Sequence, residues 1–130
     1  MENFELEIVD GVAVVKVNIA AATLRDAQSL WALFENELIF EWKKIIIDLS
    51  FCTFIDSTFI GMIVKLYKRA NQNRNCIKLV FPQITGAESF RMSGISRIME
   101  CFNTLQNAVE SYITESPVSK IVIEHELFTS

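Results

Sequence analysis

The fold is decided by one stretch near the middle of the chain, Ile46-Ile47-Asp48-Leu49-Ser50-Phe51-Cys52-Thr53-Phe54-Ile55-Asp56-Ser57-Thr58-Phe59-Ile60-Gly61. Its first residues belong to a β-branched run without polar alternation, which is typical of a central strand covered on both faces. Asp56 and Ser57 are residue types that accept hydrogen bonds from the free N–H groups at the start of a helix. The stretch therefore predicts a buried strand over residues 43–50, a short apolar connection and a helix over residues 57–73. Ligands and partners of α/β folds tend to meet the chain at such strand-to-helix turns.

The predicted helix is apolar over more of its circumference than attachment to a core requires. At about 100° per residue, polar residues gather on one side and apolar residues on the other, with Met62 and Val64 at the two borders. The apolar arc covers roughly 200°, against the ~100° that anchors a surface helix. The excess indicates either a second contact surface or borders covered by neighbouring helices, and spacing alone favours the covered borders. The polar side consists of Gly61, Lys65, Lys68, Arg69 and Gln72, and the apolar side of Phe59, Ile60, Ile63, Leu66, Tyr67 and Ala70.

Towards the amino terminus, the sequence predicts two strands and a helix. Residues 4–9 alternate apolar with acidic side chains, as a half-buried strand does. Asp10-Gly11 is a hairpin signal, so the valine-rich strand at residues 12–18 should pair antiparallel with the first. Thr23 and Asp26 then form a capping box. Behind it, apolar residues recur at helical spacing, namely Leu24, Ala27, Leu30, Trp31, Phe34 and Leu38.

Towards the carboxyl terminus, strands and helices continue to alternate. We expect a strand over residues 76–81, a short helix opened by Thr85 and Glu88 and ending near Gly94, a short strand over residues 99–102 and a helix over residues 105–113. The order predicts an α/β fold, a single domain with a mixed four- to five-stranded sheet and about four helices packed against it. Residues 1–114 form this domain, and residues 115–130 form an extension. Ile121 to Ile123 would either add an edge strand, pair with another copy in a homodimer, or stay loose.

Composition narrows the classes of function. The chain has 130 residues, 16 acidic against 12 basic, with a net charge of −4, which argues against nucleic acid as a ligand. The start lacks a signal-peptide pattern, and no apolar run approaches the roughly 18 residues that span a bilayer, so we expect a cytoplasmic protein without membrane insertion. Cys52, Cys76 and Cys101 are read as buried free thiols. With His125 as the sole histidine and no glycine-rich phosphate loop, no metal, cofactor or enzyme activity is predicted.

Two separated blocks of this sequence resemble the STAS domain, the fold of bacterial anti-sigma-factor antagonists. Asp48-Leu49-Ser50 followed by Phe54-Ile55-Asp56-Ser57-Thr58-Phe59-Ile60-Gly61 is similar to the family's strand and helix-opening turn. The pattern Phe90-x-Met92-Ser93-Gly94-Ile95-x-x-Ile98-x-x-x-Phe102 resembles its second recurrent block. The resemblance covers about residues 4–113, and the order of elements agrees with it.

The resemblance implies a role for Ser57, because the serine that directly follows the aspartate is the family's phosphoacceptor. In that family the unmodified domain binds an anti-sigma factor that is itself a serine protein kinase. Phosphorylation breaks the complex, and a serine phosphatase resets it. Thr58 is a second candidate acceptor, and we do not expect it to be phosphorylated. The implied partner-binding residues are Asp56, Ser57, Thr58, Phe59, Ile60, Gly61 and Met62, and Met62 with its neighbours would supply the apolar part of the surface.

The sequence departs from the family pattern at two places, which keeps a second function in view. Phe59 stands where the pattern has glycine, and residues 18–22 lack the acidic residue usual beside the phosphorylation site. A bulky apolar residue suits a permanent interface, so the alternative is a constitutive scaffold or accessory subunit of a signalling or lipid-transport complex. A third reading is a small-molecule or nucleotide sensor. Lys65, Lys68, Arg69 and Arg74 form a basic patch, read as a solvated face that would also fit an acidic partner surface.

Overall fold

The computed structural model describes residues 2–82, 90 and 93–114. The expected helix opened by Thr85 and Glu88 starts outside these residues. The expectations for the 115–130 extension, including the strand at residues 121–123, also lie outside them.

The core of the fold is a mixed five-stranded sheet in the order β1-β2-β4-β6-β7. Only β1 and β2 pair antiparallel, and the other neighbours pair parallel. Two further strands, β3 and β5, form a small parallel pair of their own, which the sequence did not predict. The strands are β1 (Phe4–Val9), β2 (Val12–Val17), β3 (Ala21–Ala22), β4 (Lys44–Asp48), β5 (Phe54–Ile55), β6 (Cys76–Val80) and β7 (Cys101–Phe102).

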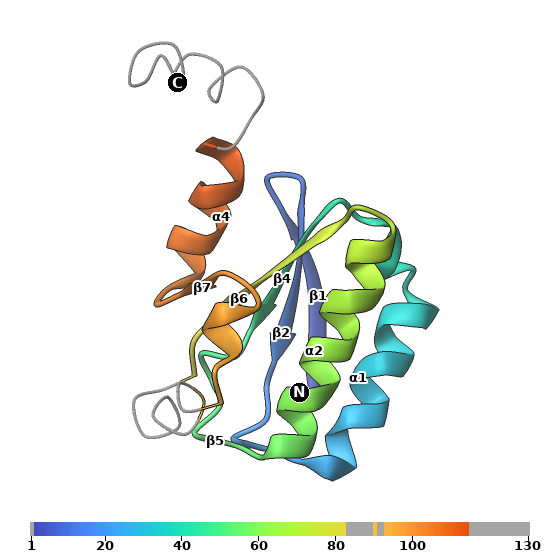
Figure 1. Cartoon of the computed structure of the whole chain (residues 1–130), viewed down its shortest axis with the longest axis vertical. Helices are drawn as coiled ribbons and strands as arrows, with labels where there is room; N and C mark the ends of the chain where they lie inside the picture. Colours follow the sequence, from blue (N-terminus) through green and yellow to red (C-terminus); the bar gives the residue numbers. More distant parts are fainter. Residues whose placement is uncertain (1, 83–89, 91–92, 115–130) are drawn as a thin grey trace.

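Three α-helices cover the sheet within the described residues: α1 (Leu24–Asn36), α2 (Ser57–Gln72) and α4 (Leu105–Thr114). Two short 3₁₀ helices, η1 (Ile39–Glu41) and η2 (Ile95–Arg97), complete the connections. α1 and α2 lie side by side on one face of the sheet, and α4 lies on the other (Figure 1). The expected α/β fold with a mixed sheet is confirmed.

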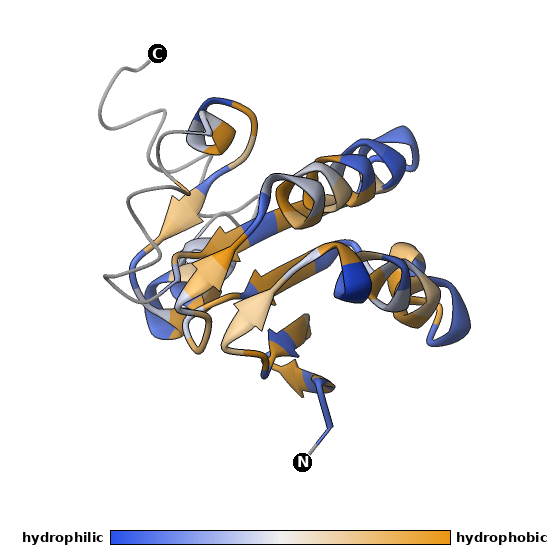
Figure 2. Cartoon of the chain, turned by 90° about the horizontal axis from the view of Figure 1, so that it is seen from below, coloured by the Kyte–Doolittle hydropathy of each residue, from blue (hydrophilic) through white to orange (hydrophobic). Residues whose placement is uncertain are grey.

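Each face of the sheet buries its own apolar cluster. The larger cluster joins α1 and α2 to the sheet and includes Leu30, Phe34, Ile47 and Leu66, all fully buried. The smaller cluster lies under α4, where the Tyr112 hydroxyl donates to the Ile45 carbonyl oxygen at 2.8 Å. The apolar colouring of β2, β4 and β6 in Figure 2 agrees with strands that are covered on both sides.

The hairpin between β1 and β2 has the predicted two-residue turn. Asp10 and Gly11 both have positive φ, 50° and 78°, and Val9 pairs with Val12. This geometry is the one that Asp-Gly favours, because its twist matches that of the flanking strands.

Several apolar residues that fit the sequence periodicity are nevertheless exposed. Leu24 is 64% and Leu38 59% exposed, since Leu24 opens α1 and Leu38 lies beyond its end with a left-handed backbone. Ile8, on edge strand β1, is 48% exposed. The expectation of buried thiols holds for Cys52 alone, because Cys76 and Cys101 are half-buried. Among the residues that the structure describes, no helix is both long and apolar enough to span a membrane.

Candidate functional site

The connection between β4 and α2 begins with a side-chain turn at Asp48. Its carboxylate oxygen Oδ1 accepts a hydrogen bond from the Ser50 backbone N–H at 3.0 Å. Leu49 and Cys52 then point into the core, both fully buried, whereas Phe51 between them is 53% exposed. The connection is therefore anchored by Leu49 and Cys52 and exposes the aromatic residue between them.

Asp56 caps two helices with one carboxylate. Oδ1 accepts from the Phe59 N–H of α2 at 2.9 Å, as an N-cap residue does, and Oδ2 accepts from the Leu24 N–H of α1, also at 2.9 Å. The Asp56 backbone N–H donates to the Ala22 carbonyl oxygen at 3.1 Å. The first turns of α1 and α2 are thus tied together, and both helices begin at the same end of the molecule (Figure 1).

The segment before α1 is pinned to the segment before α2. The Ala20 carbonyl oxygen accepts from the Thr53 N–H at 2.7 Å and from the Phe54 N–H at 3.0 Å. Ala21 and Ala22 pair with β5 in register. The segment of residues 18–22, which lacks the acidic residue of the family pattern, is therefore held beside the residues that precede α2, and Ala20 and Ala21 are exposed there.

The start of α2 presents hydroxyl groups to solvent and buries its larger apolar side chains. Ser57 and Thr58 are exposed, and Asp56 and Ile60 are half-buried. Phe59 is fully buried.

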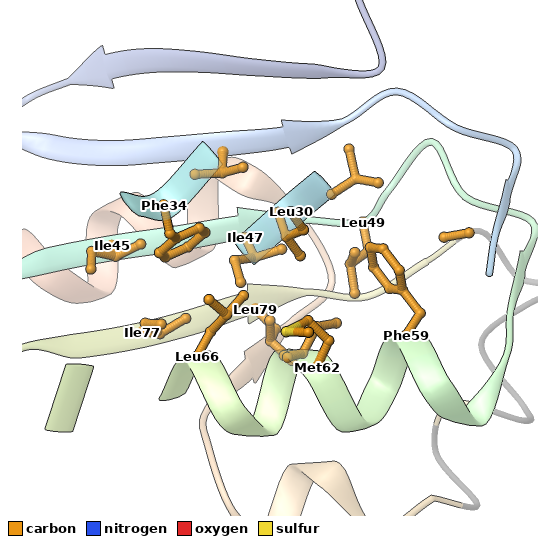
Figure 3. Close-up of a cluster of buried hydrophobic side chains, with 14 of the residues drawn as sticks. Leu30, Phe34, Ile45, Ile47, Leu49, Phe59, Met62, Leu66, Ile77 and Leu79 are labelled. Carbon is orange, nitrogen blue, oxygen red and sulfur yellow. The ribbon is translucent and has the colours of Figure 1, made fainter. Parts of the chain in front are cut away.

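Figure 3 shows Phe59 and Met62 on the side of α2 that faces the sheet, with Leu49 and Leu79 close by. The expectation that Met62 supplies exposed apolar surface is wrong, because its exposed fraction is only 7%. Met62 belongs to the larger buried cluster, which agrees with the covered borders that the spacing favoured. Phe59 is likewise absorbed by the core, so it cannot form an exposed permanent interface. Phe59 therefore gives no support to a constitutive scaffold.

Other apolar residues are exposed on the segments that lead to Ser57 and to the start of α1. Leu24, Phe51 and Phe54 are exposed by 64%, 53% and 51%, and they lie on the segments that meet at Asp56. We call Leu24, Phe51, Phe54, Ser57 and Thr58 the opening face. Its aromatic residues could not be predicted from the sequence, because a short connection without periodicity gives no indication of which side chains point outward.

A groove of about 290 Å³ runs between α1 and α2 next to the opening face. Thr58, Gly61 and Lys65 line it from α2, and Leu24 and Gln28 line it from α1, with Ala27 and Met62 completing the lining.

Cys52, in the connection before α2, and Cys101, on β7, are poor nucleophiles. Burial, followed by the nearby Asp48 and Asp26 carboxylates, raises the pKa of Cys52 to about 12. Burial and Glu100 raise the pKa of Cys101 to about 11. Because the thiolate is the reactive form, neither thiol is activated near neutral pH. Within the described part of the chain, no three His, Cys, Asp or Glu residues come together as a metal site.

Comparison with known proteins shows one family. The STAS domain profile matches residues 3–108. No curated protein sequence matches the chain significantly. A solved Thermotoga maritima structure, named as a candidate anti-sigma factor antagonist, is 26% identical over 83% of this chain and 92% of that chain, with a TM-score of 0.73.

Two more distant structures share the fold. An anti-sigma factor antagonist from Mycobacterium paratuberculosis is 19% identical over 83% of this chain and 91% of that chain, with a TM-score of 0.71. The Bacillus cell fate determinant SpoIIAA, solved in its phosphorylated form, is 18% identical over 84% of this chain and 98% of that chain, with a TM-score of 0.61.

Proposed function

The chain belongs to the STAS domain family, and from this premise we propose that it is an anti-sigma-factor antagonist switched by phosphorylation of Ser57. In this proposal the unmodified protein binds an anti-sigma factor that is also a serine protein kinase. Phosphorylation of Ser57 releases that partner, and a serine phosphatase restores binding. The protein acts by docking in the cytoplasm and catalyses no reaction itself.

The observation that carries the proposal is the setting of the Ser57 hydroxyl. It is exposed at the first position of α2, directly after the carboxylate that ties the two helix starts together. Leu24, Phe51 and Phe54 are exposed apolar residues on the segments that lead into the two helix starts. Exposed apolar patches beside polar groups are typical of protein docking sites. The opening face thus combines a hydroxyl that a kinase can reach with side chains that a partner can bury.

Electrostatics explains why a phosphate at this position would separate the complex without unfolding the domain. A phosphoserine carries about −1.5 to −2 charges, which the positive end of a helix dipole accommodates. In a complex the same charge would have to be desolvated against the partner. A penalty of about 3 kcal/mol is enough to weaken binding by more than a hundredfold.

Binding measurements with charge variants test the proposal. The wild type would first be used to isolate the anti-sigma factor kinase from the source organism, and the purified pair would be measured by calorimetry without ATP. We expect Ser57→Asp to bind at least about a hundredfold more weakly than the wild type, and Ser57→Ala to bind normally but resist phosphorylation in an intact-mass assay.

Thr114→Asp is the matched control, because it places the same charge at the far end of α4, across the sheet from the opening face. It should bind as the wild type does. Equal binding by wild type, Ser57→Ala and Ser57→Asp would sink the switch and select the constitutive scaffold.

A further inference from the structure

Gly61 is a glycine inside a long helix, where glycine is unfavourable. It is the fifth residue of α2, which runs from Ser57 to Gln72. A glycine in a helix interior is destabilising relative to alanine, because it loses more backbone freedom on folding. Such a residue is usually explained by close packing against a neighbouring element.

The packing around Gly61 gives no such explanation. A Cβ atom built on Gly61 meets no atom of a neighbouring element within 4 Å. The residue is exposed and its backbone is helical. The fold would therefore accept alanine here, and the missing side chain leaves open space on the outside of the molecule.

That open space belongs to the groove between α1 and α2. Thr58, Gly61 and Lys65 follow one another along the same side of α2 and line the groove together. Leu24, 64% exposed, lines it from α1. The groove thus has an apolar side, a floor without a side chain at Gly61, and an ammonium group one turn further along.

The charge of the groove is positive in a chain whose net charge is −4. Lys65 is the one charged residue of its described lining, and no carboxylate lines it. The partial positive charge of the two helix starts is already met by the Asp56 carboxylate, so the positive charge that remains for a ligand is that of Lys65. The complementary ligand is therefore one that combines an apolar group with a carboxylate.

We infer that this groove receives a segment of the partner protein that places an apolar side chain over Gly61 and a carboxylate against Lys65. The identity of the partner as an anti-sigma factor kinase rests on the function proposed above. The two contacts are one helical turn apart, about 6 Å along the axis, which suits an amphipathic helix with an acidic residue one turn from its apolar anchor. Ser57 lies one turn before Gly61, so its phosphate would stand beside the apolar side chain of the partner and would have to lose water when the complex forms.

Gly61→Ala tests the inference, because it should raise the stability of the fold and lower the affinity for the partner. We expect its thermal unfolding midpoint to rise above that of the wild type, because alanine is the better helix former. Its affinity for the purified kinase, measured by calorimetry without ATP, should fall at least tenfold. Asn71→Ala is the matched control, because it adds alanine at an exposed position near the end of the same helix. It should leave affinity unchanged.

The charge of the groove is tested separately with Lys65→Glu. This variant should bind at least tenfold more weakly, and added salt should weaken wild-type binding more than it weakens that of Lys65→Glu. Lys68→Glu, an exposed charge reversal on α2 outside the groove lining, should have a much smaller effect.

The outcomes separate this inference from the proposed function. If Gly61→Ala binds as the wild type does while Ser57→Asp does not, the groove is not the docking site and the switch stands. If the kinase does not bind the wild type at all, both ideas fall. If Gly61→Ala changes only self-association in sedimentation experiments, the groove receives a second copy of this chain and the assignment to a kinase is overturned.

Discussion

Among single residues, Asp56 has the most consequences, because its carboxylate serves both helices whose starts form the opening face. An ordinary N-cap aspartate satisfies donors of one helix, whereas this one accepts from Phe59 of α2 and from Leu24 of α1. The second bond joins segments that are 32 residues apart in the sequence. Asp56 therefore contributes both to stability and to the position of the exposed Leu24 side chain relative to Ser57.

Asp56→Ala should lower the free energy of unfolding by about 2 kcal/mol, the sum of a lost helix cap and a lost charge-assisted hydrogen bond. Urea unfolding followed by circular dichroism measures this loss. Asp56→Asn is the matched control and should lose about half as much, because its amide keeps one acceptor oxygen. A loss below about 0.5 kcal/mol in Asp56→Ala would mean that the two bonds contribute little in solution.

At the scale of elements, the regular strands and helices could be predicted from the sequence, but the small ones could not. The β-branched run of β4 and the Asp10-Gly11 turn each carry a strong local signal, and both predictions are confirmed. Strands β3 and β5 have two residues each, too few for any periodicity to show. Their pairing depends on hydrogen bonds from Thr53 and Phe54 to Ala20, which are contacts between distant parts of the chain.

For the candidate site, the sequence predicted which residues open α2 but not which side chains are exposed. Asp56 and Ser57 were identified from their residue types and order, and the structure places them at the start of α2 as expected. Burial at the borders of a helix was harder to predict, because it depends on how neighbouring elements pack. Met62, at such a border, is buried. Phe51 and Phe54, in the connection before α2, are exposed. Periodicity gives the face of a helix but does not give the neighbours of that face.

Helix α4 provides the next prediction, because it packs over a fully buried lysine. The Lys78 ammonium group on β6 lies 2.9 Å from Ser111 Oγ, 3.4 Å from a Glu100 carboxylate oxygen and 4.1 Å from the centre of the Tyr112 ring. The Glu100 side chain is 60% exposed, and Ser111 Oγ also donates to the Ala108 carbonyl oxygen. When the ammonium group is removed, the Glu100 carboxylate is still hydrated by water, and Ser111 keeps its hydrogen bond to the Ala108 carbonyl oxygen.

Lys78→Met should keep the free energy of unfolding within about 1 kcal/mol of the wild-type value, since an apolar chain of similar length replaces a buried charge. Lys78→Ala should lose about 2–4 kcal/mol, because it leaves a cavity under α4. Urea unfolding of the two variants, compared with the wild type, measures both. An equal loss in Lys78→Met and Lys78→Ala would show that the charge, and not the packing of the lysine stem, holds α4 in place.

For the whole molecule, the arrangement of layers explains why the candidate site lies where it does. Strand β4 lies between parallel neighbours and runs directly into the connection that ends at Asp56. In open sheets of this kind, binding sites lie beyond the carboxyl ends of the strands. α1 and α2 both start at that edge, where the connection with its exposed aromatic residues also ends, while α4 occupies the opposite face (Figure 1).

The division of the chain at residue 114 is a prediction about the whole molecule that truncation tests. Within the described residues, both buried clusters are built from residues that precede 115, the last being Tyr112 of α4. A chain of residues 1–114 should therefore unfold in urea with a free energy within about 0.5 kcal/mol of the full-length value and with an unchanged dependence on urea concentration.

Truncation places a carboxylate at the end of α4, where the helix dipole disfavours it. Replacing residues 115–130 by a glycine- and serine-rich segment of equal length is therefore the control. A loss of more than about 2 kcal/mol in both variants would place the extension inside the folding unit, whereas a loss confined to the truncated chain would come from the new terminal charge.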